Sequence, residues 1–171
     1  MRPRTVLWAS LLPDLPLVIL TAWYFITQEV GFGPRYDDLF YYDPLWVIAH
    51  NLFHAPLVTI AIGCVGAVLW RRARSAKTLA SGAVLLSLSF GTTLHTLVDI
   101  VTHHDDGPLL LFPFNWQLRY ASPVSYWDPA HYGRIVAPID LALTLLLSAY
   151  LVLRWWRRRR ERTRSVQAGG G

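Results

Sequence analysis

The chain has 171 residues, which is enough for one domain, and 53% of them are hydrophobic, with a mean hydropathy of +0.31. This composition indicates an integral membrane protein. The single cysteine, Cys64, lies in an apolar run, which excludes a disulfide framework and a cysteine metal site and favours a packing role.

Four apolar stretches reach or approach the length of about 20 residues that a membrane-spanning helix requires. They cover roughly residues 6–27, 45–70, 78–101 and 135–153. The first contains Asp14 and lacks a small-residue cleavage site, so we expect it to be retained and not removed as a signal peptide. The sequence therefore predicts an all-α fold, an integral membrane bundle of four transmembrane helices that forms a single domain over residues 1–156.

The basic residues predict the orientation of this bundle. All but three of the 16 Lys and Arg residues fall within residues 2–4, 71–77 and 154–164. By the positive-inside rule these segments face the cytoplasm, so both termini of the multi-pass protein should be cytoplasmic. Residues 157–171 are expected to form a disordered basic tail. Because topology and anionic lipids account for the net charge of +5, the expected partners are membrane lipids and not nucleic acid.

The two remaining connections, about residues 28–44 and 102–134, should face outward. The second is long and contains four prolines and seven aromatic residues. Trp and Tyr rings favour the headgroup level of a membrane, so we expect this segment to form an ordered aromatic cap at the interface. Long ordered loops are often functional.

All six histidines lie in or beside the outer half of the bundle. His50 and His54 are four residues apart, which places both imidazoles on one face of the second span, and His95, Asp99 and His103 repeat this spacing in the third. The cytoplasmic link between these spans is short, so they should be antiparallel neighbours. A single histidine here is usually an interhelical hydrogen-bond partner. Five costly ionisable groups on two adjacent faces favour a site for zinc above all, or for manganese or iron.

Two acidic residues in the spans each have two interpretations. Asp14 either caps a helix that begins at Leu15, after a short separate segment, or projects into the bundle as a metal ligand or as a partner of one. Asp140 either pairs with a histidine or makes a polar contact that stabilises the bundle, and we favour the structural role.

The cap contains further candidates. Asp105, Asp106, Asp128 and His131 can complete the site, orient its ligands or act as general acid and base. For Asp105 and Asp128 the alternative is turn formation beside Gly and Pro. Arg119 can bind a phosphate or anchor the cap to lipid headgroups.

Three motifs give the chain a resemblance to a known family. They are LLPD at residues 11–14, HNLFHAP at 50–56 and LHTLVDIVTHHDDGPLLLFPFNW at 94–116. In this order they resemble the membrane-bound predicted metal-dependent hydrolases of bacterial inner membranes. The resemblance implies a helical inner-membrane protein with an outward or interfacial metal site and phosphoester-type hydrolysis. It implies site roles for Asp14, His50, His54, His95 and Asp99.

The chain departs from this family's pattern at two places. The first motif continues Pro-Asp-Leu-Pro without a second acidic residue, and a His-His-Asp-Asp run at residues 103–106 replaces the usual turn. The second departure can supply replacement ligands.

The leading hypothesis is a membrane-embedded metal-dependent hydrolase that acts at the outer face on a phosphoester or lipid-linked substrate. The predicted metal ligands are His50, His54, His95, Asp99, His103 and Asp14. The predicted catalytic residues are Asp106, His103 and His131. Alternatives are metal-ion binding or transport without catalysis, a structural membrane protein, and haem binding by a histidine pair.

Overall fold

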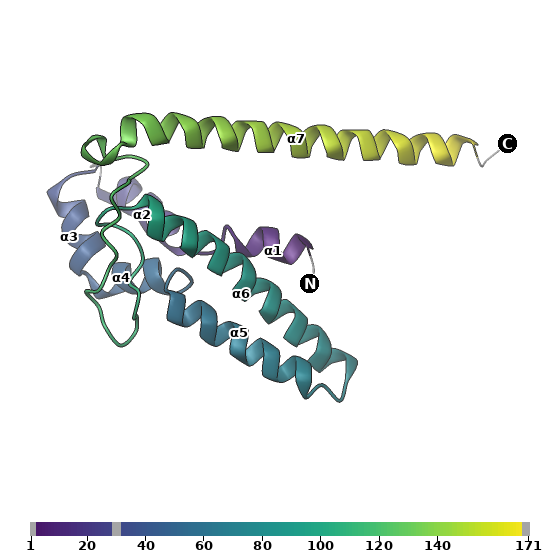
Figure 1. Cartoon of the computed structure of the whole chain (residues 1–171), viewed down its shortest axis with the longest axis horizontal. Helices are drawn as coiled ribbons and strands as arrows, with labels where there is room; N and C mark the ends of the chain where they lie inside the picture. The colour runs from purple at the N-terminus through teal and green to yellow at the C-terminus, as the bar shows by residue number, and fades with distance from the viewer. Residues whose placement is uncertain (1–2, 29–31, 169–171) are drawn as a thin grey trace. The chain divides into compact units, whose positions relative to one another are not determined.

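The computed structural model describes residues 3–28 and 32–168, and all their regular secondary structure is helical (Figure 1). The all-α prediction is therefore confirmed for these residues. The chain forms two compact units, Met1–Pro123 and Val124–Gly171. The first unit contains α1 (Pro3–Ala9), α2 (Leu15–Gln28), α3 (Pro34–Tyr42), α4 (Pro44–Asn51), α5 (Pro56–Arg71) and α6 (Ala76–Thr102). The second contains the short 3-10 helix η1 (Pro129–His131) and α7 (Gly133–Ala168).

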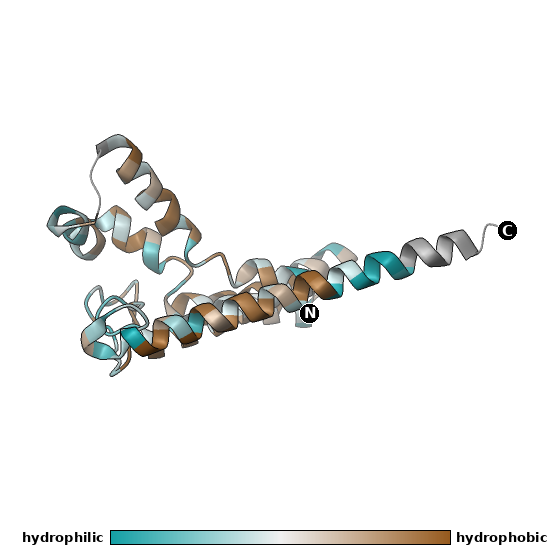
Figure 2. Ribbon diagram, turned by 90° about the horizontal axis from the view of Figure 1, so that it is seen from above, coloured by the Kyte–Doolittle hydropathy of each residue, from teal (hydrophilic) through white to brown (hydrophobic). Residues whose placement is uncertain are grey.

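Two helices are long and apolar enough to cross a membrane: α6, and α7 over Gly133–Glu161. Figure 2 shows the apolar residues of α7 giving way to hydrophilic ones toward the C-terminal end. The pair α4 and α5, bent by 50°, passes the same test as one broken span, which gives two or three candidates among the described residues. The expected first span is divided into α1 and α2, and the apolar part of α2, Leu15–Thr27, is shorter than a full span.

In the second unit, α7 begins at Gly133 and continues through the basic segment to Ala168. The last three residues of the expected tail lie outside the described residues. Within this unit, Asp128 caps η1, since its Oδ1 accepts a hydrogen bond of 2.8 Å from the backbone N–H of Ala130. The turn-forming alternative for Asp128 is therefore confirmed.

Prolines and caps determine where the helices of the first unit begin. Pro44 and Pro56 occupy the first turns of α4 and α5, where a missing N–H costs nothing. Asp43 caps α4 through Oδ1, which accepts a hydrogen bond of 2.9 Å from the N–H of Leu45. Ala55, directly before Pro56, is extended, as the residue before a proline prefers. The chain therefore leaves the helical path between α4 and α5, and this break carries His54.

Helices α5 and α6 pack side by side, as the short link between them predicts (Figure 1). Two glycines allow their backbones to approach closely. A Cβ at Gly66 would lie 2.9 Å from the backbone nitrogen of Leu86, and one at Gly82 would lie 2.7 Å from that of Trp70. Small residues at such contacts are typical of helices that associate within membranes.

Part of the expected cap is folded against α4. Asn51 is fully buried, and its Oδ1 accepts a hydrogen bond of 2.7 Å from the N–H of Leu109 while its Nδ2 donates to the carbonyl of Val47 at 2.8 Å. Leu109 and Phe112 then pack with residues of α4 and the α4–α5 break in a small apolar core. Asn51 thus fixes the start of the cap to the helix that precedes the site.

Candidate metal centre

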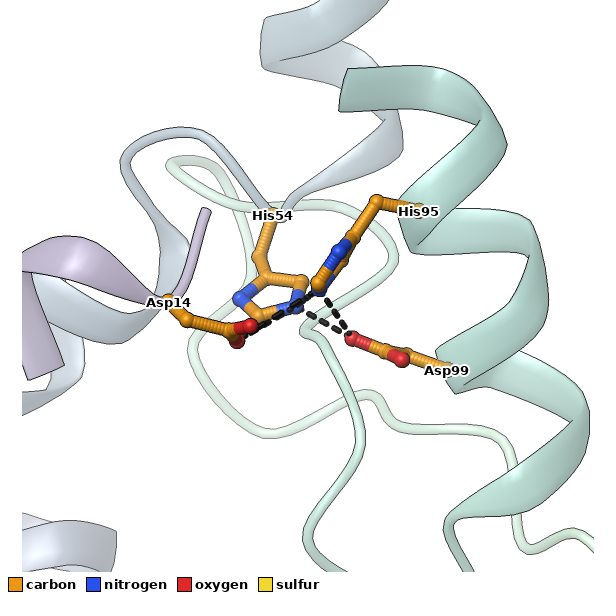
Figure 3. Close-up of side chains that lie close together, drawn as sticks. All are labelled: Asp14, His54, His95 and Asp99. Carbon is orange, nitrogen blue, oxygen red and sulfur yellow. Dashed lines mark hydrogen bonds and ion pairs between the residues drawn. The ribbon is translucent and has the colours of Figure 1, made fainter. Parts of the chain in front are cut away.

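Four side chains from three separate parts of the chain converge in the first unit: Asp14, His54, His95 and Asp99 (Figure 3). Asp14 lies between α1 and α2, and His54 lies in the break between α4 and α5. His95 and Asp99 lie one turn apart on α6. Each residue offers one ligand atom, and these atoms lie within 4.8 Å of one another. We call these four residues the His/Asp cluster.

The distances within the His/Asp cluster suit a shared ion. His95 Nε2 lies 3.0 Å from His54 Nε2, 2.9 Å from Asp99 Oδ2 and 3.4 Å from Asp14 Oδ1. His54 Nε2 contacts Asp99 Oδ2 and lies 3.8 Å from Asp14 Oδ1. Ligands bound tetrahedrally at zinc bond lengths lie about 3.3 Å from one another. The observed separations bracket this value, and two imidazoles with two carboxylates are a donor set that zinc, manganese and iron accept.

The His54 ring is oriented by the polypeptide. Its Nδ1 lies 3.1 Å from the carbonyl oxygen of His50, which accepts a hydrogen bond when Nδ1 carries the proton. In that tautomer the lone pair of Nε2 points into the His/Asp cluster. The backbone of His54 is also tied to α6, because Thr96 Oγ1 donates to its carbonyl at 2.7 Å. A backbone hydrogen bond of this kind at the other ring nitrogen is characteristic of metal-binding histidines.

The His/Asp cluster is open on one side. The side chain of His54 is 3% exposed, whereas that of Asp14 is 51% exposed. Helix α2 begins directly after Asp14, at Leu15, and the backbone carbonyl of Asp14 accepts a hydrogen bond from the N–H of Val18. The carboxylate of Asp14 faces the two histidines. The Asp14 side of the cluster is therefore its more accessible side.

His50, predicted as a ligand, lies beside the His/Asp cluster and not within it. Its ring centroid is 4.9 Å from that of His54 and 4.9 Å from that of Phe40. The ring is buried, and its Nδ1 has no hydrogen-bond partner among the described residues. A buried unpaired nitrogen is costly, so this atom is available to a ligand.

His103 and Asp106 also lie next to the cluster. His103 caps the C-terminus of α6, and its Nδ1 lies 3.1 Å from the carbonyl oxygen of Asp99. Its Nε2 is 3.9 Å from Asp106 Oδ2. Asp105 is exposed.

His131 belongs to the second unit. There its Nδ1 lies 2.7 Å from Asp128 Oδ2, so an Asp–His pair sits on η1. Asp140 is exposed on α7. The catalytic role of His131 and the structural role of Asp140 stay predictions.

Sequence analysis gave no role to Tyr41, Asn51 or Thr96. Tyr41 lies with Phe40 around Arg119, whose guanidinium carbon is 5.7 and 5.8 Å from the two ring centroids. Arg119 also donates to the carbonyl of Gly107, so its head group is held inside this unit. For Asn51, the one sequence signal is a polar residue directly after the predicted ligand His50. Thr96 and Tyr41 have no distinguishing sequence signal, because the chain contains many other Thr and Tyr residues.

Burial perturbs two groups that lie together in the first unit, Tyr41 of α3 and Arg119 of the cap. The pKa of Tyr41 is raised to about 12, first by burial and then by the charges of Asp105 and Asp106. Burial lowers the pKa of Arg119, against the opposing effects of Tyr41 and the same two carboxylates. Arg119 keeps its charge near neutral pH, because the guanidinium reference value is so high.

A scan against protein-family models, a search of curated proteins and a search of solved structures gave no match. The resemblance to membrane-bound metal-dependent hydrolases therefore stays a prediction.

Proposed function

We propose that this protein is a metal-dependent hydrolase of a bacterial inner membrane, built on four spans with both termini in the cytoplasm. The observation that carries the proposal is the convergence of Asp14, His54, His95 and Asp99 from three distant segments. Burying ionisable groups in a membrane protein is costly, and such groups normally mark a functional site.

The proposed topology uses the broken helices as spans. α6 and α7 each cross once, the bent pair α4–α5 crosses once, and α1 with α2 forms a crossing interrupted at Asp14. Interrupted helices at membrane depth are tolerated where the irregular backbone lines a cavity or lies within protein. Both breaks in this chain carry a residue of the His/Asp cluster, which supports a functional reason for them.

The chemistry follows from what the residues can hold. His54, His95, Asp99 and Asp14 would bind one divalent metal, zinc most suitably, with manganese and iron as alternatives. A bound metal of this kind lowers the pKa of its water and polarises a phosphoryl or carbonyl oxygen. His103 with Asp106 supplies an imidazole and a carboxylate beside the cluster that can accept or return a proton.

The proposed substrate is a phosphoester or lipid-linked molecule that enters at the outward-facing side of the inner membrane. The exposed flank at Asp14 gives it access to the His/Asp cluster. Exposed aromatic side chains of the cap, among them Phe114 and Trp116, suit an acyl chain or a headgroup region at the entry.

Haem binding fits the geometry less well. A haem iron holds two axial nitrogens on opposite sides of the ring, about 4 Å apart with the porphyrin between them. His54 Nε2 and His95 Nε2 are 3.0 Å apart, and Asp99 Oδ2 contacts both nitrogens. This arrangement leaves no room for a macrocycle between the two imidazoles.

Metal transport also fits less well. Transport through the bundle requires a polar path from the cluster toward the cytoplasm. Toward the cytoplasmic side of the His/Asp cluster, the hydroxyl residues Thr59, Ser89 and Thr93 make polar contacts between α5 and α6. The Ser89 hydroxyl donates to the carbonyl of Thr59 at 2.8 Å, and that of Thr93 donates to the Thr59 hydroxyl at 3.2 Å. These hydroxyls are used to join two helices and supply no charged group for an ion.

The test is hydrolysis by the purified full-length protein in lipid nanodiscs, assayed on bis-p-nitrophenyl phosphate and on phosphatidic acid. The parent should turn over at least one substrate after loading with zinc or manganese and lose the activity with a chelator. The His95→Ala, Asp99→Ala variant should be inactive, whereas Asp140→Asn, on exposed α7, should retain activity. Equal turnover by the parent and the double variant would contradict the proposal.

A further inference from the structure

The surface of α7 changes from apolar to basic within a few residues (Figure 2). Its apolar part, residues 135–153, is about 28 Å long at a rise of 1.5 Å per residue, close to the thickness of about 30 Å of a bilayer's hydrocarbon core. Trp155 and Trp156 come soon after it. They are followed by four consecutive arginines, Arg157, Arg158, Arg159 and Arg160. If α7 crosses a membrane, the tryptophans therefore lie at its interface and the arginines at the level of the headgroups.

The four arginines surround the axis of α7, and we call them the arginine collar. The helix continues unbroken through them to Ala168, so consecutive side chains are rotated by about 100° and four of them cover almost a full turn. All four side chains are exposed. A helix that lies flat on a membrane needs an apolar face along its length, and the collar leaves no such face. This segment is therefore suited to pass upright through the headgroup layer, with lipid on every side.

Two guanidinium groups of the collar lie over the tryptophans one turn earlier. The guanidinium carbon of Arg160 is 3.4 Å from the ring centroid of Trp156, and that of Arg159 is 5.2 Å from the ring centroid of Trp155. Both indoles are about half exposed. A guanidinium stacked on a ring still presents N–H donors at its edge, and this planar fork matches the oxygens of a phosphate.

Acidic side chains are scarce near the collar. Glu161 is the one acidic residue between Asp140 and the end of the sequence, so the segment keeps a net positive charge. At the depth that α7 gives the collar, the available anions are phospholipid headgroups. Zwitterionic headgroups carry no net charge, so electrostatic attraction favours acidic ones.

We propose that the arginine collar binds acidic phospholipids and gathers them around α7 in the cytoplasmic leaflet. This inference goes beyond the proposed hydrolase, because it assigns a lipid contact to the second unit that requires no metal and no turnover. It takes from the proposed function only the crossing of the membrane by α7. A basic side chain at an anionic surface strengthens the attraction roughly fivefold, so each lipid that meets the collar gains a measurable preference.

The test is electron paramagnetic resonance of spin-labelled lipids around the purified full-length protein in phosphatidylcholine vesicles. The probes are traces of spin-labelled phosphatidylglycerol or phosphatidylcholine, and the immobilised fraction of each gives its relative affinity for the protein surface. The parent should prefer phosphatidylglycerol by about threefold or more at low salt and lose the preference in about 1 M NaCl. Both leaflets have the same composition, so the direction of insertion does not affect the result.

Two variants remove equal charge from different places. The collar variant carries Arg157→Gln, Arg158→Gln, Arg159→Gln and Arg160→Gln, and it should lose most of the preference. The control variant carries Arg71→Gln, Arg72→Gln, Arg74→Gln and Lys77→Gln. It should keep most of the preference, because these residues lie at the link between two packed helices and face lipid on fewer sides.

Three results would overturn the proposal: no preference in the parent, a preference that survives high salt, or equal losses in the two variants. Nucleic acid is the competing polyanion. A short DNA duplex that abolishes the phosphatidylglycerol preference of the parent at about 0.15 M NaCl would assign the collar to nucleic acid instead. Circular dichroism verifies that each variant stays helical. Failure here leaves the proposed hydrolysis standing, since that proposal is tested by turnover and metal dependence.

Discussion

Replacing Asn51 by Ala should detach the cap from α4. Asn51 makes two buried hydrogen bonds, and its removal leaves the N–H of Leu109 buried without a partner. An orphaned buried donor costs about 1–3 kcal/mol, and the second lost bond adds about 1 kcal/mol. We therefore expect Asn51→Ala to lower the free energy of unfolding by about 2–4 kcal/mol.

The matched control is Asn115→Ala. Asn115 also makes two hydrogen bonds with the backbone, both accepted from the N–H groups of Gln117 and Leu118, but it lies in an exposed turn where water can replace it. Its loss should cost about 1 kcal/mol or less. The assay is reversible denaturant unfolding in detergent micelles, combined with hydrogen exchange at Leu109. Equal losses of stability in the two variants, or unchanged protection of Leu109 in Asn51→Ala, would refute the reasoning.

Three further predictions follow from the packing and charges of the first unit. Gly82→Ala should lower the free energy of unfolding of the bundle by about 1–3 kcal/mol through overpacking, because the added Cβ would lie 2.7 Å from a backbone nitrogen of α5. The control is Gly33→Ala, whose Cβ would have nothing within 4 Å and which should be neutral when both variants are compared by thermal unfolding. Tyr41→Phe should remove the tyrosinate absorbance that appears near pH 12. Because the pKa of Tyr41 is raised in the folded protein, Tyr41 stabilises the fold fully below its unfolded pKa near 10, and this contribution is lost as the pH rises toward 12. If the absorbance that disappears in Tyr41→Phe belongs to a tyrosine that ionises at a lower pH, the burial argument is contradicted. Thr96→Val should weaken zinc binding about tenfold or more by calorimetry, because it removes the hydrogen bond that holds the backbone of His54. Thr92→Val is the control, since the Thr92 hydroxyl donates to carbonyls of its own helix, α6, and this variant should leave the affinity unchanged. Equal affinities of the two variants would rule out the positioning role of Thr96.

Much of the His/Asp cluster could be predicted because helical spacing and a short connection determine where most of its side chains lie. His95 and Asp99 are four residues apart on a regular helix, so their side chains must share a face. A short basic link then requires the preceding span to run antiparallel, which brings His54 to the same end. Hydropathy located α6 and the apolar part of α7, since a long apolar helix can be identified from its own residues without knowledge of what packs against it.

The position of His50 could not be predicted in this way. The i, i+4 argument assumes one continuous helix through His50 and His54, but α4 ends at Asn51 and α5 begins at Pro56 with a 50° bend between them. His54 therefore lies in the break, and its ring turns to Asp99 while His50 remains against Phe40. Pro56 indicated a helix start, yet the rotation between two helical segments depends on what packs against them.

The cap was predicted as one segment, 102–134, but the structure divides that segment between its two units at Pro123. The aromatic content of the segment gave no sign of this boundary. The contacts that fold its first part, from Asn51 to Leu109 and from Arg119 to Gly107, join residues far apart in the sequence. Long-range hydrogen bonds of this kind leave no periodic pattern that a sequence can reveal.

The most direct test of the central claim is elemental analysis of the purified protein, prepared without a histidine tag, beside the His95→Ala, Asp99→Ala variant and a His131→Ala control from the second unit. The account predicts one equivalent or more of zinc, manganese or iron in the parent and the control, and only traces in the folded double variant. A parent without metal after reconstitution, or a double variant that retains the full amount, would contradict it.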